Sequence, residues 1–202
     1  MDEQTAINLL RKGDLQGLET LIQLYYLRAV KAAYLIVQER HEAEDIVQDA
    51  YLHAYEKIHQ LTGDRFGPWF LRSVVNAAIK SGQKHEMQVS LSADLGGDAR
   101  SLEDLLADPQ PTPESAMEMS ELSQQVWQAL QRLSAEQRAA VVMKYYLGMS
   151  EAEMTTRLSQ PLSTVKWRLY AARQRLKNFL RPNLDPQAPN PRRANRSSEK
   201  QE

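Results

Sequence analysis

The residues best suited to binding chemistry form a basic run between Leu162 and Arg181. This segment holds six lysines and arginines and no aspartate or glutamate, which gives it a charge of about +6. Those side chains are Lys166, Arg168, Arg173, Arg175, Lys177 and Arg181. Apolar residues recur between them at helical spacing, so the segment predicts an amphipathic helix. Such a helix can neutralise phosphates, although charge and spacing alone fit a solvated surface helix equally well.

The residues before this run predict how the basic helix is positioned. Ser150 and Glu153 have the spacing of a capping box, which starts a short helix. Pro161 ends that helix, and Ser163 or Thr164 can cap the next one. A short helix, a tight turn and a basic second helix are typical of a helix-turn-helix, whose second helix enters the major groove of DNA.

A second group of polar side chains gathers on one face of a helix predicted over residues 41–60. The group consists of Glu42, Glu44, Asp45, Gln48, Asp49 and Glu56. Carboxylates can serve acid–base or metal chemistry, but the chain has no cysteine, and His41 and His53 lack the spacing of a ligand set. We therefore expect no metal, no cofactor and no catalytic site. The pattern alone therefore favours an ordinary solvated surface.

The composition of the whole chain narrows the class of protein. Its 202 residues carry a formal net charge of −1, so any attraction to nucleic acid must come from a local surface. The absence of cysteine excludes disulfides and fits a reducing compartment. The sequence has no apolar run of about 18 residues and no signal-peptide pattern at its acidic start. We expect a cytoplasmic protein without membrane insertion.

Glycine is sparse and alternating strand patterns are hard to find, so the fold class is predicted as all-α. Acidic residues, prolines and glycines in 86–119 indicate a flexible acidic linker between two small helical domains, 1–85 and 120–181. The proline-rich segment 182–202 predicts a disordered tail.

Tyr145, like the apolar residues around it, is expected to pack beneath the helix-turn-helix.

Two parts of the chain resemble one known family. The stretches Leu133–Arg138, Val141–Ser150 and Thr164–Arg173 are similar to region 4 of an extracytoplasmic-function sigma factor of bacterial RNA polymerase, within the sigma-70 family. Independently, Ala43–Tyr51 resembles region 2.2 of the same family. The resemblance implies a σ2-like domain and a σ4-like helix-turn-helix domain, with no intervening σ3 domain.

The resemblance also implies partners. Region 2.2 is the helix with which family members dock on the β′ clamp helices of core RNA polymerase, which here implicates Glu44, Asp45, Gln48 and Asp49. The second polymerase contact implied is the β flap. Promoter DNA is the other expected ligand, and an anti-sigma factor is a further expected partner because family members are commonly held inactive by one.

Promoter contacts follow from the same resemblance. For the −35 element they are Ser163, Thr164, Lys166, Trp167, Arg168, Tyr170 and Arg173. Trp69, Arg72 and Asn76 match the family pattern of regions 2.3 and 2.4, which hold the melted −10 element. Capturing flipped bases needs a pocket and a basic track for the single strand. The residues implied for this element are Arg65, Arg72, Asn76, Lys80 and Lys84.

The sequence departs from the family pattern in both DNA-binding segments. After Asn76 it lacks the usual acid and arginine pair, and Trp167 and Ala171 replace a small residue and an arginine. Trp167 and Ala171 predict a shifted −35 preference, and the segment after Asn76 leaves the −10 sequence unassigned. The function expected is promoter-specific initiation by a non-enzymatic factor. The alternatives are a stand-alone helix-turn-helix regulator that does not bind polymerase and an all-helical interaction protein without DNA function.

Overall fold

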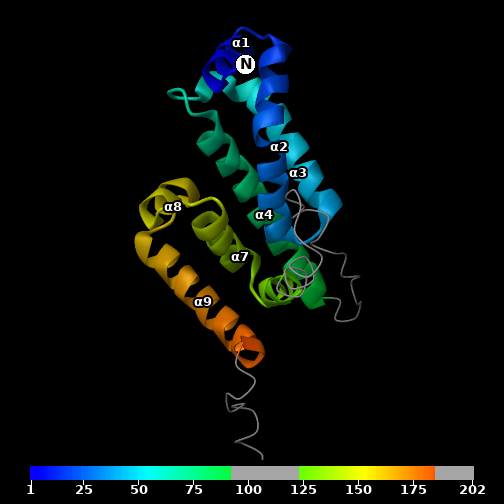
Figure 1. Ribbon diagram of the computed structural model, residues 1–202, viewed down its shortest axis with the longest axis vertical. Coiled ribbons are helices and arrows are strands. Elements are labelled where there is room, and N and C mark those ends of the chain that lie inside the picture. The colour runs from blue at the N-terminus through cyan, green and yellow to red at the C-terminus, as the bar shows by residue number, and fades with distance from the viewer. Residues whose placement is uncertain (92–122, 185–202) are drawn as a thin grey trace, which may run out of the picture.

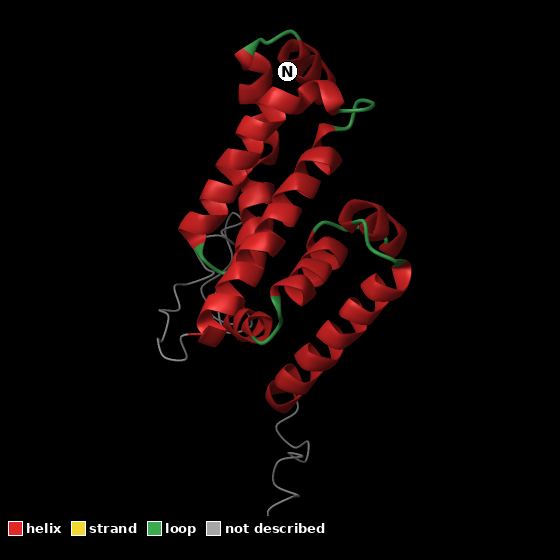
Figure 2. Cartoon of the chain, turned by 180° about the vertical axis from the view of Figure 1, so that it is seen from behind, coloured by secondary structure: helices red, strands yellow, loops and turns green. Residues whose placement is uncertain are grey.

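The computed structural model describes residues 1–91 and 123–184, and these residues contain helices but no strands. The N-terminal half comprises α1 (Glu3–Arg11), α2 (Leu15–Val37), α3 (Arg40–Lys57), the short 3-10 helix η1 (Ile58–Gln60) and α4 (Phe66–Leu91). The C-terminal half comprises a helix over residues 123–131, α7 (Ala135–Val141), the π-helical turn η2 (Val142–Tyr146), α8 (Glu151–Leu158) and α9 (Leu162–Leu184). The all-α prediction is confirmed (Figures 1 and 2).

Short polar residues start the helices that position the candidate sites. The Asp14 carboxylate accepts a hydrogen bond from the Gln16 backbone at the start of α2. At the start of α8, the Ser150 hydroxyl accepts from the Glu153 backbone while the Glu153 carboxylate accepts from the Ser150 backbone. The predicted capping box is therefore confirmed, and it satisfies backbone donors that a helix start leaves unpaired.

Two helices extend beyond the boundaries expected from composition. Helix α4 continues to Leu91, into the range assigned to the linker, because residues 86–91 contain no glycine or proline to stop it. Helix α9 continues to Leu184. The rest of the predicted linker, and the predicted tail from residue 185 onward, lie outside the described residues.

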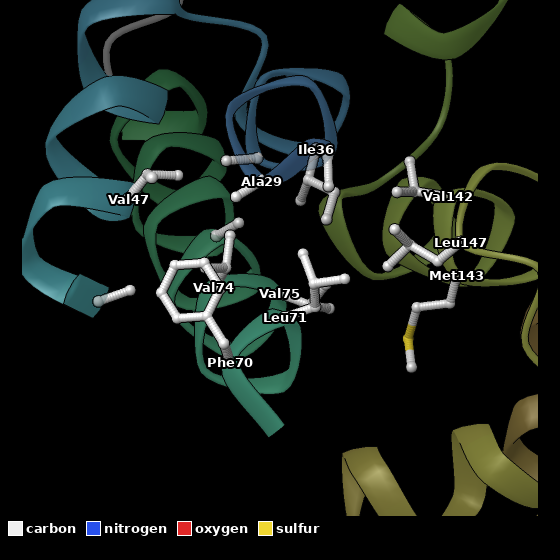
Figure 3. Close-up of a cluster of buried hydrophobic side chains, with 14 of the residues drawn as sticks. Ala29, Ile36, Val47, Phe70, Leu71, Val74, Val75, Val142, Met143 and Leu147 are labelled. Carbon is white, nitrogen blue, oxygen red and sulfur yellow. The ribbon is translucent and has the colours of Figure 1, made fainter. Parts of the chain in front are cut away.

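The larger of two buried apolar clusters in the described residues runs through both halves of the molecule. On the N-terminal side it contains Ile36 from α2 and Leu71 and Val75 from α4, all buried. On the C-terminal side Val142 and Met143 point toward them from η2 (Figure 3). The two halves therefore pack face to face, with α2 and α4 against α7 and η2.

Candidate nucleic-acid interface

The pair α8–α9 has the architecture that the sequence predicts for a helix-turn-helix. Ser159 ends α8 in the left-handed conformation at φ 51°, and α9 begins after Pro161. Met154, Val165 and Leu169 are fully buried between the helices and the rest of the C-terminal half. This packing fixes one side of α9 and leaves the other side exposed to a ligand.

Most of the predicted −35 residues lie on that exposed side of α9. Ser163, Lys166, Trp167, Tyr170 and Arg173 are exposed, and Thr164 is half-buried. Trp167 and Tyr170 keep 64% and 61% of their surface accessible. Large aromatic side chains next to a lysine on an exposed helix face mark a contact surface rather than a core.

Arg168 lies apart from this exposed face. Its Nη2 donates to Glu136 Oε1 of α7 at 2.7 Å, and only 13% of its side chain is exposed. The helical wheel explains this position, because Arg168 lies three residues after Val165 and next to Leu169, at the border of the buried stripe. In the structure, Arg168 joins α9 to α7 through its contact with Glu136.

Arg173 is held by a residue that sequence reasoning assigned to the core. Arg173 Nε donates to the Tyr145 hydroxyl at 2.8 Å, and its guanidinium lies 5.9 Å from the centre of the same ring. Tyr145 is 60% exposed, so the prediction that it packs beneath the helix-turn-helix is wrong. The cause is the π-helical turn η2, whose extra residue rotates the side chains that follow it out of α-helical register.

The predicted −10 residues form a line along α4. Arg72, Asn76, Lys80 and Lys84 recur every four residues, so they share one side of the helix, and Arg65 lies just before its start. All are exposed except Asn76, which is half-buried. Near the start of this line, Pro68, Trp69 and Arg72 face residues of α8 across a small cavity of about 270 Å³.

The electrostatics near this cavity are unfavourable to a further cation. Across it lies Arg157 of α8, which donates a hydrogen bond to the Pro68 carbonyl. Burial lowers the pKa of Arg157, and the like charges of Arg65 and Arg72 lower it further, against the favourable charge of Glu153. Several arginines therefore converge where α8 meets α4, which favours an anion at this place.

The acidic face of α3 is the third candidate surface. Asp45, Gln48 and Asp49 are exposed, whereas Glu44 is half-buried and accepts from Arg40 Nε at 2.9 Å. Leu52 lies on the same helix with 63% of its surface exposed. Sequence reasoning did not single out Leu52, because one exposed leucine is ordinary on a protein surface and gives no signal by itself.

Other kinds of site lack support in the described part of the chain. Within residues 1–91 and 123–184, no group of three or more histidine, aspartate or glutamate side chains is arranged to hold a metal ion. No helix in these ranges combines the length and hydrophobicity that crossing a membrane requires.

Comparisons with known proteins match both halves separately. A family model of sigma-70 region 2 matches residues 21–86, and a model of sigma-70 region 4 matches residues 123–176. The first match contains the two surfaces on α3 and on most of α4, and the second contains the surface on α8 and most of α9.

Relatives of similar length match nearly the whole chain. The extracytoplasmic-function RNA polymerase sigma factor SigW of Bacillus subtilis is 29% identical over 177 residues, covering 87% of this chain and 95% of the relative. The RNA polymerase sigma-H factor of Pseudomonas aeruginosa is 26% identical, covering 90% and 95%. The sigma-E factor of Escherichia coli is also 26% identical, covering 90% and 96%.

Solved structures share the fold. The structure of CnrH in complex with the cytosolic domain of CnrY matches with a TM-score of 0.56 at 18% identity, over 88% of this chain and 96% of that one. The sigma factor RpoE in complex with the anti-sigma factor NepR, from Bartonella quintana, matches with a TM-score of 0.57 at 24% identity, over 81% and 94%.

Proposed function

This chain belongs to the extracytoplasmic-function sigma factors of the sigma-70 family, and on that premise we propose how its surfaces direct promoter-specific initiation by bacterial RNA polymerase. It binds core polymerase and brings it to promoters, and it contributes binding rather than a catalytic step of its own. The observation that carries this proposal is the presence, in one chain, of an exposed basic recognition helix and a separate basic edge on α4.

Helix α9 reads the −35 element in the major groove. Lys166 and Tyr170 lie on its exposed side, and a lysine can donate to the O6 and N7 acceptors of guanine. Trp167 offers an apolar surface to the methyl group of thymine. Arg173, steadied by Tyr145, holds a phosphate. Arg168 supports the helix from behind through Glu136.

The edge of α4 binds the −10 element after the strands separate. Arg65, Arg72, Lys80 and Lys84 follow the backbone of one strand with their charges, and Asn76 donates and accepts at a base edge. Because Asn76 is half-buried among them, a base has to leave the stack to reach it.

The acidic face of α3 binds the β′ clamp helices. Exposed Asp45, Gln48 and Asp49 meet basic groups of the polymerase and set the register, while Leu52 supplies apolar contact at the same place. Glu44 is partly neutralised by Arg40 and contributes less. The C-terminal half binds the β flap.

The protein works in the cytoplasm, where its polymerase is, and an anti-sigma factor holds it inactive until it is needed. The support for this partner comes from the fold alone, since the structurally similar RpoE of Bartonella quintana was solved in complex with the anti-sigma factor NepR.

Run-off transcription with core bacterial polymerase on fragments of the organism's own genome tests the function. We expect specific starts that appear only when this protein is added. An absence of starts together with an absence of comigration with core polymerase would instead indicate a stand-alone helix-turn-helix regulator.

A matched pair of variants tests the −35 assignment. Lys166→Ala removes a charge from the exposed face near the start of α9, and Lys177→Ala removes the same charge from an exposed position further along the helix. We expect Lys166→Ala to weaken promoter binding by about 1–3 kcal/mol, with a much smaller effect on random duplex. Equal losses on both duplexes would make Lys166 a phosphate contact only.

A further inference from the structure

A cavity of about 390 Å³ lies between the two halves of the chain, beside the start of α4. Residues of α1, α2, α4, α8 and the turn after η2 line it. Three of them are arginines from separate segments, namely Arg28 of α2, Arg65 before α4 and Arg157 of α8. The volume lies within the range of small-molecule sites, roughly 300–1,000 Å³. We call this space the arginine cavity.

The guanidinium groups of the arginine cavity are held in place without being neutralised. Arg28 Nη2 donates to the Leu147 carbonyl at 3.3 Å, and Arg157 Nη1 donates to the Pro68 carbonyl. Each of these bonds uses one nitrogen of a group that has five N–H donors. Among residues 1–91 and 123–184, no carboxylate lies within ion-pair distance of Arg28, Arg65 or Arg157. The cavity therefore offers charged donors to a ligand.

The two carboxylates that line the arginine cavity are bound at helix starts. Glu3 Oε1 accepts from the backbone N–H groups of Phe66 and Gly67, at 2.9 and 3.3 Å. Glu153 Oε2 accepts from the backbone and the hydroxyl of Ser150, both at 2.8 Å. Helix starts carry a partial positive charge, which offsets part of the charge of these carboxylates. Since the arginines also outnumber them, the cavity favours an anion.

The charge of Arg157 would gain from such an anion. Burial lowers the pKa of Arg157; Glu153 opposes this effect, and the like charges of Arg65 and Arg72 add to it. A bound anion would separate these like charges and stabilise the charged form of Arg157. A planar guanidinium donates paired hydrogen bonds that match the oxygens of a phosphate. Guanidinium groups on three segments suit an anion with more than one phosphate.

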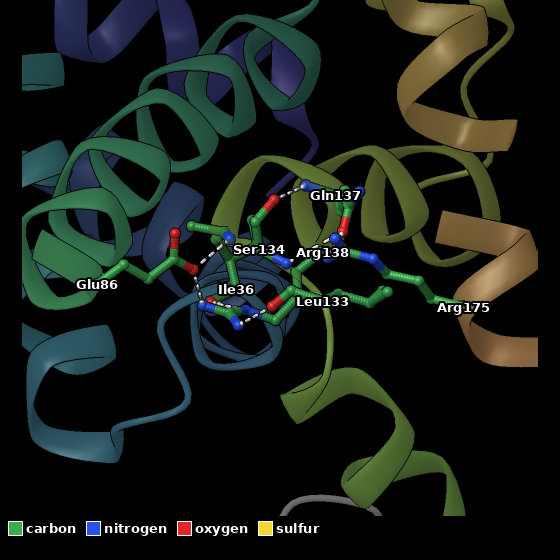
Figure 4. A network of polar contacts seen from close by, with 8 residues as sticks. Ile36, Glu86, Leu133, Ser134, Gln137, Arg138 and Arg175 are labelled. Atoms are coloured by element: carbon green, nitrogen blue, oxygen red, sulfur yellow. Dashed lines mark hydrogen bonds and ion pairs between the residues drawn. The ribbon is translucent and has the colours of Figure 1, made fainter. Parts of the chain in front are cut away.

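Buried contacts elsewhere between the halves hold the walls of the cavity in position. Arg138 of α7 is only 5% exposed, and its Nε donates to the Ile36 carbonyl at the end of α2, at 2.5 Å. Its Nη1 donates to the Leu133 carbonyl at 2.7 Å, and its Nη2 lies 3.3 Å from Glu86 Oε1 of α4 (Figure 4). A Cβ atom added to Gly82 of α4 would lie 2.7 Å from a side chain of α7, so the helices approach closely. A ligand thus meets a preformed site and has little ordering to offset.

We propose that the arginine cavity is a binding site for a small anion with a diphosphate group, held by Arg28, Arg65 and Arg157. Inorganic pyrophosphate and nucleoside diphosphates both carry this group. A position between two packed halves favours such a small molecule over a DNA duplex. The inference goes beyond the proposed function, and its test needs neither polymerase nor promoter, so either can fail while the other stands.

Isothermal titration calorimetry with the full chain, at low ionic strength and without divalent cations, tests the site. We expect saturable one-to-one binding of inorganic pyrophosphate, and binding of orthophosphate about tenfold weaker or less, because one phosphate forms fewer charged hydrogen bonds. Tighter binding of ADP than of pyrophosphate would assign the site to a nucleotide, and equal binding to the inorganic group. A lack of saturable binding by both diphosphates would overturn the proposal.

A matched pair of variants locates the binding. Arg65→Gln removes an exposed charge from the cavity, whereas Arg132→Gln removes the same charge from an exposed position outside it. We expect Arg65→Gln to weaken pyrophosphate binding about tenfold, and Arg157→Gln to do the same with unchanged helix content by circular dichroism. Arg132→Gln should change it by less than about twofold, because salt screens a distant exposed charge. Equal losses in Arg65→Gln and Arg132→Gln would indicate unspecific attraction and refute the site.

A third variant changes the affinity in the opposite direction, which damage to the fold cannot imitate. Glu153→Gln removes a negative charge from the wall of the cavity, and its amide oxygen can still accept from the Ser150 backbone. We expect pyrophosphate to bind this variant a few-fold more tightly than the wild type. Unchanged or weaker binding would contradict the placement of the anion beside Arg157.

Discussion

Replacing Arg168 with methionine separates a structural role from a DNA contact. Methionine keeps an unbranched apolar side chain in place of the arginine stem but cannot donate to Glu136. In the structure, Arg168 Nη2 lies 2.7 Å from Glu136 Oε1 and the arginine side chain is 13% exposed. We therefore expect the variant to lose stability and to keep its preference for the promoter.

The magnitude follows from the surroundings of the pair. A hydrogen bond between charged groups contributes about 1.5–3 kcal/mol net. The Glu136 side chain is 36% exposed and keeps its bond from Gln83 at 3.0 Å, so water and that amide compensate for part of the loss. The variant's loss in free energy of unfolding should therefore lie near the lower end of that range, at about 1.5 kcal/mol. With a urea m value of about 2 kcal/mol per molar, the unfolding midpoint falls by about 0.7 M.

Urea unfolding followed by circular dichroism measures the stability, and anisotropy titrations of promoter and random duplex over a salt series measure the binding. Lys166→Met is the control, because its exposed side chain should leave the midpoint unchanged and weaken promoter binding. If Arg168→Met kept the wild-type midpoint and lowered the slope of log K against log salt by about 0.9, Arg168 would be a phosphate contact and the reasoning would be refuted.

Further expectations concern the residues that support the sites. Tyr145→Phe removes the acceptor of the 2.8 Å bond from Arg173, so both promoter and random duplex should bind a few-fold more weakly by anisotropy; unchanged binding would contradict this positioning role. Ser150→Ala should cost about 1 kcal/mol in urea unfolding, as lost helix caps do. The backbone hydrogen bond from Ser150 holds the pKa of Glu153 below its ordinary value. The Glu153 carboxylate therefore contributes fully to the stability of the fold at neutral pH, and this contribution is lost as the pH falls through the lowered pKa. Glu153→Gln should show less loss of stability on acidification than the wild type. Gly67→Ala would press a Cβ against the Tyr25 ring of α2, and we expect it to destabilise the fold by about 1–3 kcal/mol, measured as a lower urea midpoint.

Local features of the sequence predicted much of the fold. The capping box at Ser150 and Glu153, the break at Pro161 and the exposed side of α9 follow from rules that act over a few residues, and the structure contains each of them. Arg168 is predicted as a −35 contact that holds a phosphate or a partner within the helix, whereas in the structure it pairs with Glu136 of α7, which no local rule indicates. With Val165 and Leu169 as the buried reference, the helical wheel places Arg168 at the border of the buried stripe.

Long-range contacts could not be predicted in this way. Nothing local to Arg138 indicates that it ends among the Ile36 carbonyl and Glu86, because these partners are 102 and 52 residues away. The exposure of Tyr145 depends on the π-helical turn, which has no marker in a single sequence. For the same reason, the role of Gly82 as a point of close approach becomes visible only when α7 is packed against α4.

The two ends of the interface between the N-terminal and C-terminal halves differ in strength. At one end Arg138 is buried and its guanidinium has acceptors on three residues, so releasing it leaves polar groups to be rehydrated. At the other end Arg157 lies close to Arg65 and Arg72, whose like charges disfavour its charged form. The contact that Arg72 makes with Ser159 at the end of α8 is an exposed hydrogen bond of 3.4 Å. Separating α8 from α4 should therefore cost less free energy than withdrawing Arg138 from Ile36, Leu133 and Glu86.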